Sequence, residues 1–234
     1  MTGIICAMQL EADGILALCE NKQTETIYGM TFTTGTLHDR ELTVVVCGVG
    51  KVNAAMCAAI LIDRFHPELI INSGVGGALS PLVSIGDLVV GSKAVEHDMN
   101  MKPLGYQQGE VCIPGGKMMY FECDKTAATK LAAIGKTVPD TRVAQGIIAS
   151  GDVFISDRKK RLLLNTRFGA VACEMEGAAI GHVCYCCGVP FAILRAISDD
   201  LDENKGMDFN KFCHMAAEKT VKVIEGFMKE SKSE

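Results

Sequence analysis

Apolar runs and helical repeats alternate along most of this chain. Runs rich in Val, Ile and Leu predict strands at 4–8, 42–47, 68–72, 87–97, 142–150 and 191–197. Between them, apolar residues at helical spacing predict helices at 10–18, 52–65, 124–134, 158–166, 176–187 and 209–228. Residues 26–47 are expected to hold two or three antiparallel strands, with turns at 28–29 and 38–39.

This alternation predicts the α/β fold class. Strands that alternate with helices form a parallel or mixed sheet that is covered on both faces. We expect a single three-layer αβα domain with a central mixed sheet over residues 1–234, because no repeat, low-complexity tract or linker interrupts the pattern. Residues 98–120, rich in glycine and proline, are expected to form a long loop, and Gly91 to kink the strand before it.

Polar or glycine-rich sequence follows several of the predicted strands. These stretches are 8–11, 48–50, 74–77, 151–155 and 198–199. Ligands bind outside the carboxyl ends of strands in open α/β sheets, so a pocket is expected there. Taken alone, the glycines are weak signals. The segment 48–53 lacks the third glycine of a dinucleotide fingerprint, and 74–77 fits either a phosphate cradle or a close backbone approach.

Acidic residues beside apolar segments mark the most informative part of the chain. Cys173-Glu174-Met175-Glu176-Gly177 is followed about twenty residues on by Arg195-Ala196-Ile197-Ser198-Asp199-Asp200. Burying an unpaired carboxylate costs several kcal/mol in rough terms. Two interpretations follow from these residues alone: a small-molecule site, or a salt-bridged structural network.

Charge and cysteine content narrow the function classes. A net charge of −5 and the lack of a basic stripe argue against a nucleic-acid or membrane partner, and the run 158–161 is expected to be a solvated helix face. With neither a signal-like start nor a spanning apolar run, we expect a cytoplasmic protein. Most of the eleven cysteines lie in apolar segments, and five are expected to be buried thiols: Cys6, Cys47, Cys57, Cys173 and Cys184. Neither a metal nor an organic cofactor is expected, because 184–187 lacks zinc-site spacing.

Six motifs together resemble one enzyme family. AMQLE, CGVGKVNAA, INSGVGGAL, SGDVFI, CEMEG and RAISD occur in order, and the similarity runs from about residue 3 to about 228. The combination is similar to the 5′-methylthioadenosine/S-adenosylhomocysteine nucleosidases of the nucleoside phosphorylase/hydrolase superfamily. The resemblance implies a homodimeric hydrolase of methionine salvage that releases adenine from both nucleosides, with 5′-deoxyadenosine as a further candidate.

The same resemblance implies residue roles. Asp199 is similar to the general acid at adenine N7, Ser198 to the residue that orients it, and Glu11 to the glutamate that activates water. Glu176 resembles the carboxylate that grips the ribose hydroxyls. The further substrate contacts implied are Met175 against the sugar, Arg195 on the water and sugar side, Phe154 stacked on adenine, Ile155 at the purine edge, Met8, Val49 and Phe209 around the alkylthio group, and Val75 and Gly76. Leu104 would be contributed across a dimer interface.

The chemistry of N-glycosidic bond cleavage independently supports these residue roles. An N-glycosidic bond breaks more easily when the purine is protonated and the ribose carries positive charge, so Asp199 has to hold a proton near pH 7. Three acids in three environments fit such a reaction. Glu174 is expected to be structural or superficial, and Asp200 to be a loop or helix-start acid. For His97-Asp98, a capped strand end is favoured over a catalytic pair.

Several alternatives remain open. A phosphorylase of this superfamily would need an arginine and a serine where Asn72 and Val75 stand, so hydrolysis without phosphate is favoured. Val75 and Leu104 also depart from the nucleosidase pattern, which often has serine at the first place and an aromatic residue at the second. These departures bear on the turnover rate and on the preference for the 5′-alkylthio group. A purine nucleosidase for inosine or futalosine and a non-catalytic nucleoside-binding protein are the other candidates.

Overall fold

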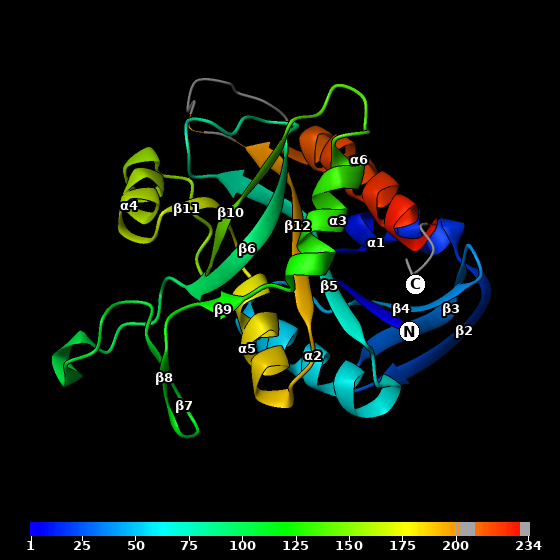
Figure 1. Cartoon of the computed structure of the whole chain (residues 1–234), viewed down its shortest axis with the longest axis horizontal. Coiled ribbons are helices and arrows are strands. Elements are labelled where there is room, and N and C mark those ends of the chain that lie inside the picture. Colours follow the sequence, from blue (N-terminus) through cyan, green and yellow to red (C-terminus); the bar gives the residue numbers. More distant parts are fainter. Residues whose placement is uncertain (200, 202–208, 230–234) are drawn as a thin grey trace.

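The computed structural model describes residues 1–199, 201 and 209–229, apart from the side chains of 209–211. Its main sheet runs in the order β11-β10-β6-β12-β5-β1-β4-β3-β2, with β9 paired to β6 (Figure 1). The strands are β1 (Thr2–Cys6), β2 (Glu20–Ile27), β3 (Met30–Leu37), β4 (Arg40–Val46), β5 (Leu69–Ala78), β6 (Leu88–Glu96), β9 (Phe121–Glu122), β10 (Val143–Ser150), β11 (Ala170–Glu174) and β12 (Phe191–Asp199). Parallel pairs such as β1–β5 occur beside antiparallel ones such as β6–β12, so the sheet is mixed as predicted.

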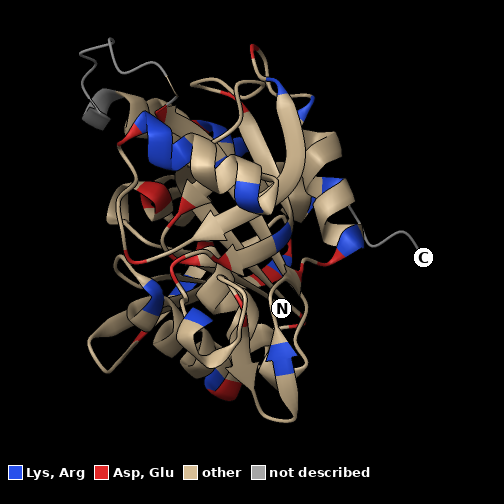
Figure 2. Cartoon of the chain, turned by 90° about the vertical axis from the view of Figure 1, so that its left-hand side faces the viewer, with Lys and Arg blue, Asp and Glu red and all other residues tan. Residues whose placement is uncertain are grey.

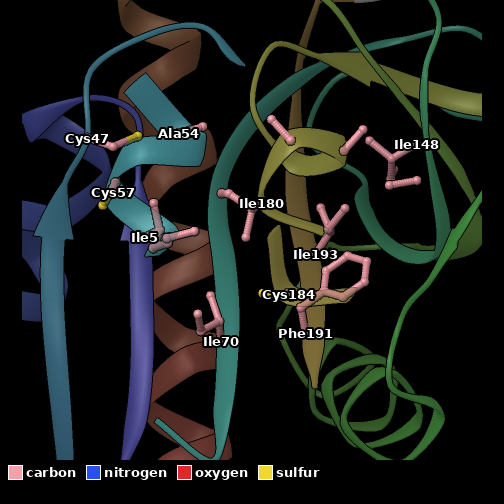
Figure 3. Close-up of a cluster of buried hydrophobic side chains, with 14 of the residues drawn as sticks. Ile5, Cys47, Ala54, Cys57, Ile70, Ile148, Ile180, Cys184, Phe191 and Ile193 are labelled. Atoms are coloured by element: carbon pink, nitrogen blue, oxygen red, sulfur yellow. The ribbon is translucent and has the colours of Figure 1, made fainter. Parts of the chain in front are cut away.

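Helices cover both faces of this sheet, which confirms the three-layer αβα prediction. They are α1 (Gln9–Leu18), α2 (Lys51–Phe65), α3 (Lys125–Gly135), α4 (Arg158–Phe168), α5 (Gly177–Cys187) and α6 (Phe209–Lys229), with a 3₁₀ turn η1 (Lys102–Leu104). One core cluster joins α2 and α5 to the sheet, and a second joins α1, α3 and α6 to it. Figure 3 shows the first cluster, which includes Ile5 and Ile70 of neighbouring strands, Cys57 of α2, Ile180 of α5 and Ile193 of β12. No helix in the described part of the chain is both long and apolar enough to cross a membrane.

The structure differs from the sequence-based elements in several places, including β2, which begins at Glu20 and not near residue 26, and the unpredicted two-residue strand β9. The strand expected at 68–72 continues as β5 to Ala78, so the glycine-rich segment is strand and not loop. The strand β11 was not predicted. The expected loop 98–120 contains η1 and a hairpin of β7 (Val111–Ile113) and β8 (Gly116–Met118), which extends away from the sheet in Figure 1. The five cysteines expected in the core are buried, as predicted.

One strand pairing shapes the edge of the sheet that carries the site. At its end, β11 pairs antiparallel with the end of β5, through Ala172 with Ala78 and Cys173 with Gly77. The strands β11, β10, β6, β12 and β5 therefore form a closed ring of hydrogen-bonded neighbours. This closure places Glu174, at the end of β11, next to the ends of β5 and β12.

Candidate active site

A cavity of about 200 Å³ lies where these strand ends meet. The part of the site that the structure describes brings together twelve of the thirteen predicted site residues, drawn from six separate segments of the chain. They are Met8, Glu11, Val49, Val75, Gly76, Phe154, Ile155, Met175, Glu176, Arg195, Ser198 and Asp199. The thirteenth, Phe209, begins α6, and its side chain lies outside the described residues, as does Asp200. Strand ends far apart in sequence thus form one pocket, as predicted.

Glu11 is held rigidly in the first turn of α1. Its side chain is 1% exposed. One carboxylate oxygen accepts hydrogen bonds from the backbone N–H groups of Ala7 and Met8, both at 2.9 Å, and the other accepts from Val75 N–H at 2.9 Å. Three N–H donors satisfy much of the demand of a buried carboxylate. Glu11 therefore lies in the first turn of the helix, where acidic residues are common, and it also lines the cavity.

Arg195 of β12 is a buried cation that several carboxylates share. It is 1% exposed, and its Nη2 donates to Asn72 Oδ1 and to Glu174 Oε2. The same nitrogen lies 3.5 Å from Glu176 Oε2. Burial alone would lower the pKa of Arg195, but the charges of Glu174 and Glu176 raise it above its ordinary value. Glu11 is the third acid of this group.

Glu174 is structural, as expected, but it is deeply buried and not superficial. Its Oε2 accepts from the N–H groups of Glu176 at 3.0 Å and Gly177 at 2.7 Å, so it caps the start of α5. Its Oε1 accepts from the Ser150 hydroxyl. The acidic segment therefore contains a salt-bridged network, formed by Glu174 and Arg195, and Glu176 is fixed beside this network at the cavity.

Glu176 stands at the N-cap of α5 with 3% of its surface exposed. Its Oε1 accepts a hydrogen bond from Gly50 N–H at 2.9 Å, which ties it to the turn after β4. Burial, reinforced by the charge of Glu174, raises the pKa of Glu176 to about 7, against the opposing effect of Arg195. Near neutral pH this group is therefore present in both protonation states.

Asp199, at the end of β12, has both carboxylate oxygens engaged. Oδ1 accepts from the Ser198 hydroxyl at 2.9 Å, which agrees with the orienting role expected for that serine. Oδ2 accepts from Nη2 of Arg161, a contact that was not predicted. The run 158–161 is thus only partly a solvated face: residues 158–160 are exposed, whereas Arg161 is 4% exposed. Figure 2 shows acidic and basic residues interspersed on the side of the molecule that carries α4.

The glycines of β5 permit a close approach of other side chains. A Cβ on Gly74 would overlap Arg195 Nη1 and Glu11 Oε1, and a Cβ on Gly77 would lie 2.9 Å from Asp199 Oδ2. Real Cβ atoms do not come this close to other heavy atoms without displacement. Of the two interpretations of residues 74–77, close backbone approach is therefore the one the structure supports, with the glycines packed against three of the proposed site residues.

The His97-Asp98 pair does not lie in the cavity lining. Asp98 Oδ1 accepts from Lys51 Nζ at 2.7 Å, and Asp98 Oδ2 accepts from Asp152 N–H at 2.9 Å. Lys51 N–H in turn donates to Asp152 at 2.7 Å. These hydrogen bonds fix the segment that leads to Phe154. Asp98 therefore holds neighbouring backbone in place just after the end of β6, in line with the capped strand end that the sequence favoured. Burial lowers the pKa of His97.

Exposure differs among the apolar residues assigned to substrate. Phe154 is 61% exposed and Val49 is 49% exposed, although both line the cavity. Leu104, in η1, is 74% exposed and lies outside the cavity lining. The apolar residues Phe154 and Val49 are therefore exposed to solvent, whereas Glu11 and Glu176 in the same cavity lining are buried.

The chain belongs to the phosphorylase superfamily, whose family model matches residues 2–229. Among solved structures, it is similar to the 5′-methylthioadenosine/S-adenosylhomocysteine nucleosidase of Neisseria meningitidis in complex with methylthio-immucillin-A, with 30% identity, a TM-score of 0.90 and coverage of 97% of this chain and 98% of that one. The S-adenosylhomocysteine nucleosidase of Streptococcus pyogenes in complex with 5-methylthiotubericidin is 33% identical, with a TM-score of 0.89 and coverage of 97% and 95%. The futalosine hydrolase of Helicobacter pylori is 30% identical, with a TM-score of 0.89 and coverage of 98% and 97%.

These similarities confirm the resemblance stated from the motifs. They also confirm that the chain is an enzyme of the N-glycosyl hydrolase class. The relatives include nucleosidases named for different nucleosides at nearly equal similarity, so the substrate has to be argued from the site.

Proposed function

We propose that this enzyme hydrolyses the N-glycosidic bond of 5′-methylthioadenosine and S-adenosylhomocysteine, releasing adenine and the 5-substituted ribose. In this proposal Asp199 is the acid that protonates N7 of the purine, and Glu11 is the base that orients and deprotonates water. Glu176 holds the ribose hydroxyls. The proposal is supported by the cavity that all three acids share and by the similar nucleosidases solved in complex with methylthio-immucillin-A and 5-methylthiotubericidin.

The lining of the cavity suggests how such a nucleoside would lie. The purine would occupy the end formed by Phe154, Ile155 and Asp199, since an aromatic ring there can stack on a base. The ribose would lie over Met175 and Glu176. Met8 and Val49 would contact the 5′-alkylthio group, together with Phe209, whose side chain is outside the described residues.

The reaction follows from that placement. As the bond between C1′ and the purine breaks, a proton passes from Asp199 to N7, and the ribose gains positive charge. Negative charge on Glu176 and Glu11 favours such a cation in a buried site. Water held by Glu11 attacks C1′ and gives its proton to the carboxylate. In the structure, three backbone N–H groups already orient that carboxylate.

The charges of the buried side chains at the cavity favour water over phosphate as the attacking group. The buried Arg195 faces Glu11, Glu174 and Glu176, so this group holds more negative than positive charge even when Glu176 is protonated. A phosphate dianion would enter that field without a free positive partner in the group. Asn72, which stands where a phosphorylase would need an arginine, is 0% exposed and already accepts from Arg195.

A substrate panel tests this function. Purified protein is incubated with 5′-methylthioadenosine, S-adenosylhomocysteine, 5′-deoxyadenosine, adenosine, inosine and futalosine, with and without phosphate. Free base and sugar product are then measured. We expect adenine and free 5-methylthioribose from the first substrate at the same rate in both buffers. Release that requires phosphate and yields a sugar 1-phosphate would instead identify a phosphorylase, and preference for futalosine would reassign the substrate.

We further propose that residues 1–234 act as one domain, in a cytoplasmic homodimer that serves methionine salvage. Support for the dimer comes from exposed apolar side chains, among them Val49 at 49% in the cavity lining, Val52 at 79% on α2 and Leu104 at 74% in η1. Sedimentation of the purified chain tests the dimer. A Leu104→Glu variant that sediments as the wild type does, with unchanged KM, would remove Leu104 from the interface.

A further inference from the structure

Arg161 is a buried arginine on α4 that joins three segments around the purine end of the cavity. Its Nη2 donates to Asp199 Oδ2, and its Nε donates to the carbonyl of Ile155 at 2.9 Å. Its Nη1 lies 3.4 Å from the carbonyl oxygen of Ala78. These partners come from the end of β12, the segment after β10 and the end of β5, so one guanidinium connects all three.

The contact has consequences for how Asp199 is held. Ser198 fixes one carboxylate oxygen at 2.9 Å, and Arg161 fixes the other. A guanidinium presents several donors in a rigid plane, so it fixes direction as well as distance. The same plane holds the carbonyl of Ile155, in the segment proposed to face the purine. The direction of the Asp199 carboxylate is thus coupled to the position of the Ile155 segment, which is proposed to face the purine.

We propose that Arg161 is a positioning residue that, through its ion pair with Asp199 and its hydrogen bond to Ile155, aims the Asp199 carboxylate at the purine. This inference rests on the proposed role of Asp199 as the acid. Arg161 is not among the described residues that line the cavity, whereas its partners Asp199 and Ile155 are, so it is not itself a catalytic residue.

The surroundings of Asp199 allow a test by pH. Besides Arg161 on α4, it is faced by the thiols of Cys173 on β11 and Cys213 on α6. Burial raises the pKa of Cys173 to about 12 and that of Cys213 to about 11, so both thiols stay neutral over the working range. Arg161, by contrast, is a charged side chain in direct contact with Asp199.

Two substitutions separate charge from geometry. Arg161→Gln removes the charge, and Arg161→Lys keeps it without the planar fork. The pH profile of kcat/KM is measured with 5′-methylthioadenosine, because this quantity reports the free enzyme, in which the ion pair is seen. Lys159→Gln, an exposed residue of the same basic run, is the matched control and should leave the profile unchanged.

We expect Arg161→Gln to lower kcat/KM about tenfold or more at neutral pH and to move its alkaline limb to higher pH. Arg161→Lys should lower kcat while the alkaline limb keeps its wild-type position. An Arg161→Gln variant with an equal loss at every pH, or with wild-type activity, overturns the proposal. If that variant does not fold, wild-type kcat in Arg161→Lys overturns it instead. A wild-type protein inactive on every nucleoside would contradict the proposed function itself, a result distinct from all of these.

Discussion

The Glu11 carboxylate accepts a hydrogen bond from the backbone N–H of Val75 at 2.9 Å, across the gap between α1 and β5. This bond joins the proposed base to the residue that replaces a serine common in nucleosidases. Because Val75 offers only its backbone there, the water would be held chiefly by Glu11 and Arg195.

Replacing Glu11 by Gln should abolish adenine release and also destabilise the fold. An amide nitrogen cannot accept the N–H bonds that the carboxylate oxygens accept now, so a buried donor would lose its partner at a cost of about 1–3 kcal/mol. Urea unfolding and adenine release measure the two effects. Asp13→Asn, at an exposed position on the same helix, should change neither. Substantial turnover in Glu11→Gln would exclude Glu11 as the base.

Replacing Asp199 by Asn should lower kcat for 5′-methylthioadenosine by about 10²–10⁴-fold, the usual contribution of a general acid. Binding should largely survive, because the amide has nearly the same shape and the remaining lining is unchanged. Single-turnover kinetics gives the first quantity and calorimetric titration the second. Normal turnover in this variant would remove Asp199 from the acid role.

Replacing Gly77 by Ala should reduce kcat far more than it reduces stability. The added Cβ would lie 2.9 Å from Asp199 Oδ2 and would displace a carboxylate that Ser198 and Arg161 hold. We expect a loss of about tenfold or more, since small misplacements of catalytic groups are costly. Gly116→Ala, where nothing lies within 4 Å of the new Cβ, is the control. Equal kcat in both variants would mean that the carboxylate is not fixed as described.

The stability of the protein should depend on pH through Glu176. Its pKa in the folded chain is about 7, above the ordinary 4.5, so the folded form favours the neutral acid. Its contribution is fully present below about pH 4.5 and is lost as the pH rises through about 7. Relative to wild type, a Glu176→Gln variant should therefore gain about 3 kcal/mol in unfolding free energy between pH 4.5 and pH 8.

Urea unfolding of both proteins at several pH values measures this difference. Glu20→Gln, at an exposed strand position, serves as the comparison and should show no such trend. A constant difference between wild type and Glu176→Gln would show that the burial of Glu176 has no effect on its ionisation.

Most of the strands and most of the site could be predicted from the sequence, because both are encoded locally. Apolar runs such as 42–47 and 191–197 identify buried strands, and the motif residues follow directly at their ends. The extension of β5 was missed because glycine is unfavourable in strands, and only side chains packed against it show why it is needed. The strand β11 was missed because its sequence AVACE contains a single β-branched residue, Val171, and therefore carries a weak strand signal.

Arg161 was missed for a related reason. Within four consecutive basic residues, charge suggests exposure, and only α4 geometry shows which one turns inward. A signal was nevertheless present: Arg161, Leu164 and Phe168 recur at i, i+3 and i+7, and these are the buried residues of the helix. Its partner, Asp199, is 38 residues away, a distance that no local pattern can span.

The closed ring of strands limits how this site can change in evolution. In β5, Gly77 pairs with both Cys173 and Asp199, from strands on either side. Adding or deleting a single residue in β5 would turn every later side chain to the opposite face and break both registers at once. Homologues should therefore differ in length at the hairpin of β7 and β8, which pairs with no strand of the ring, and keep a fixed length along β5.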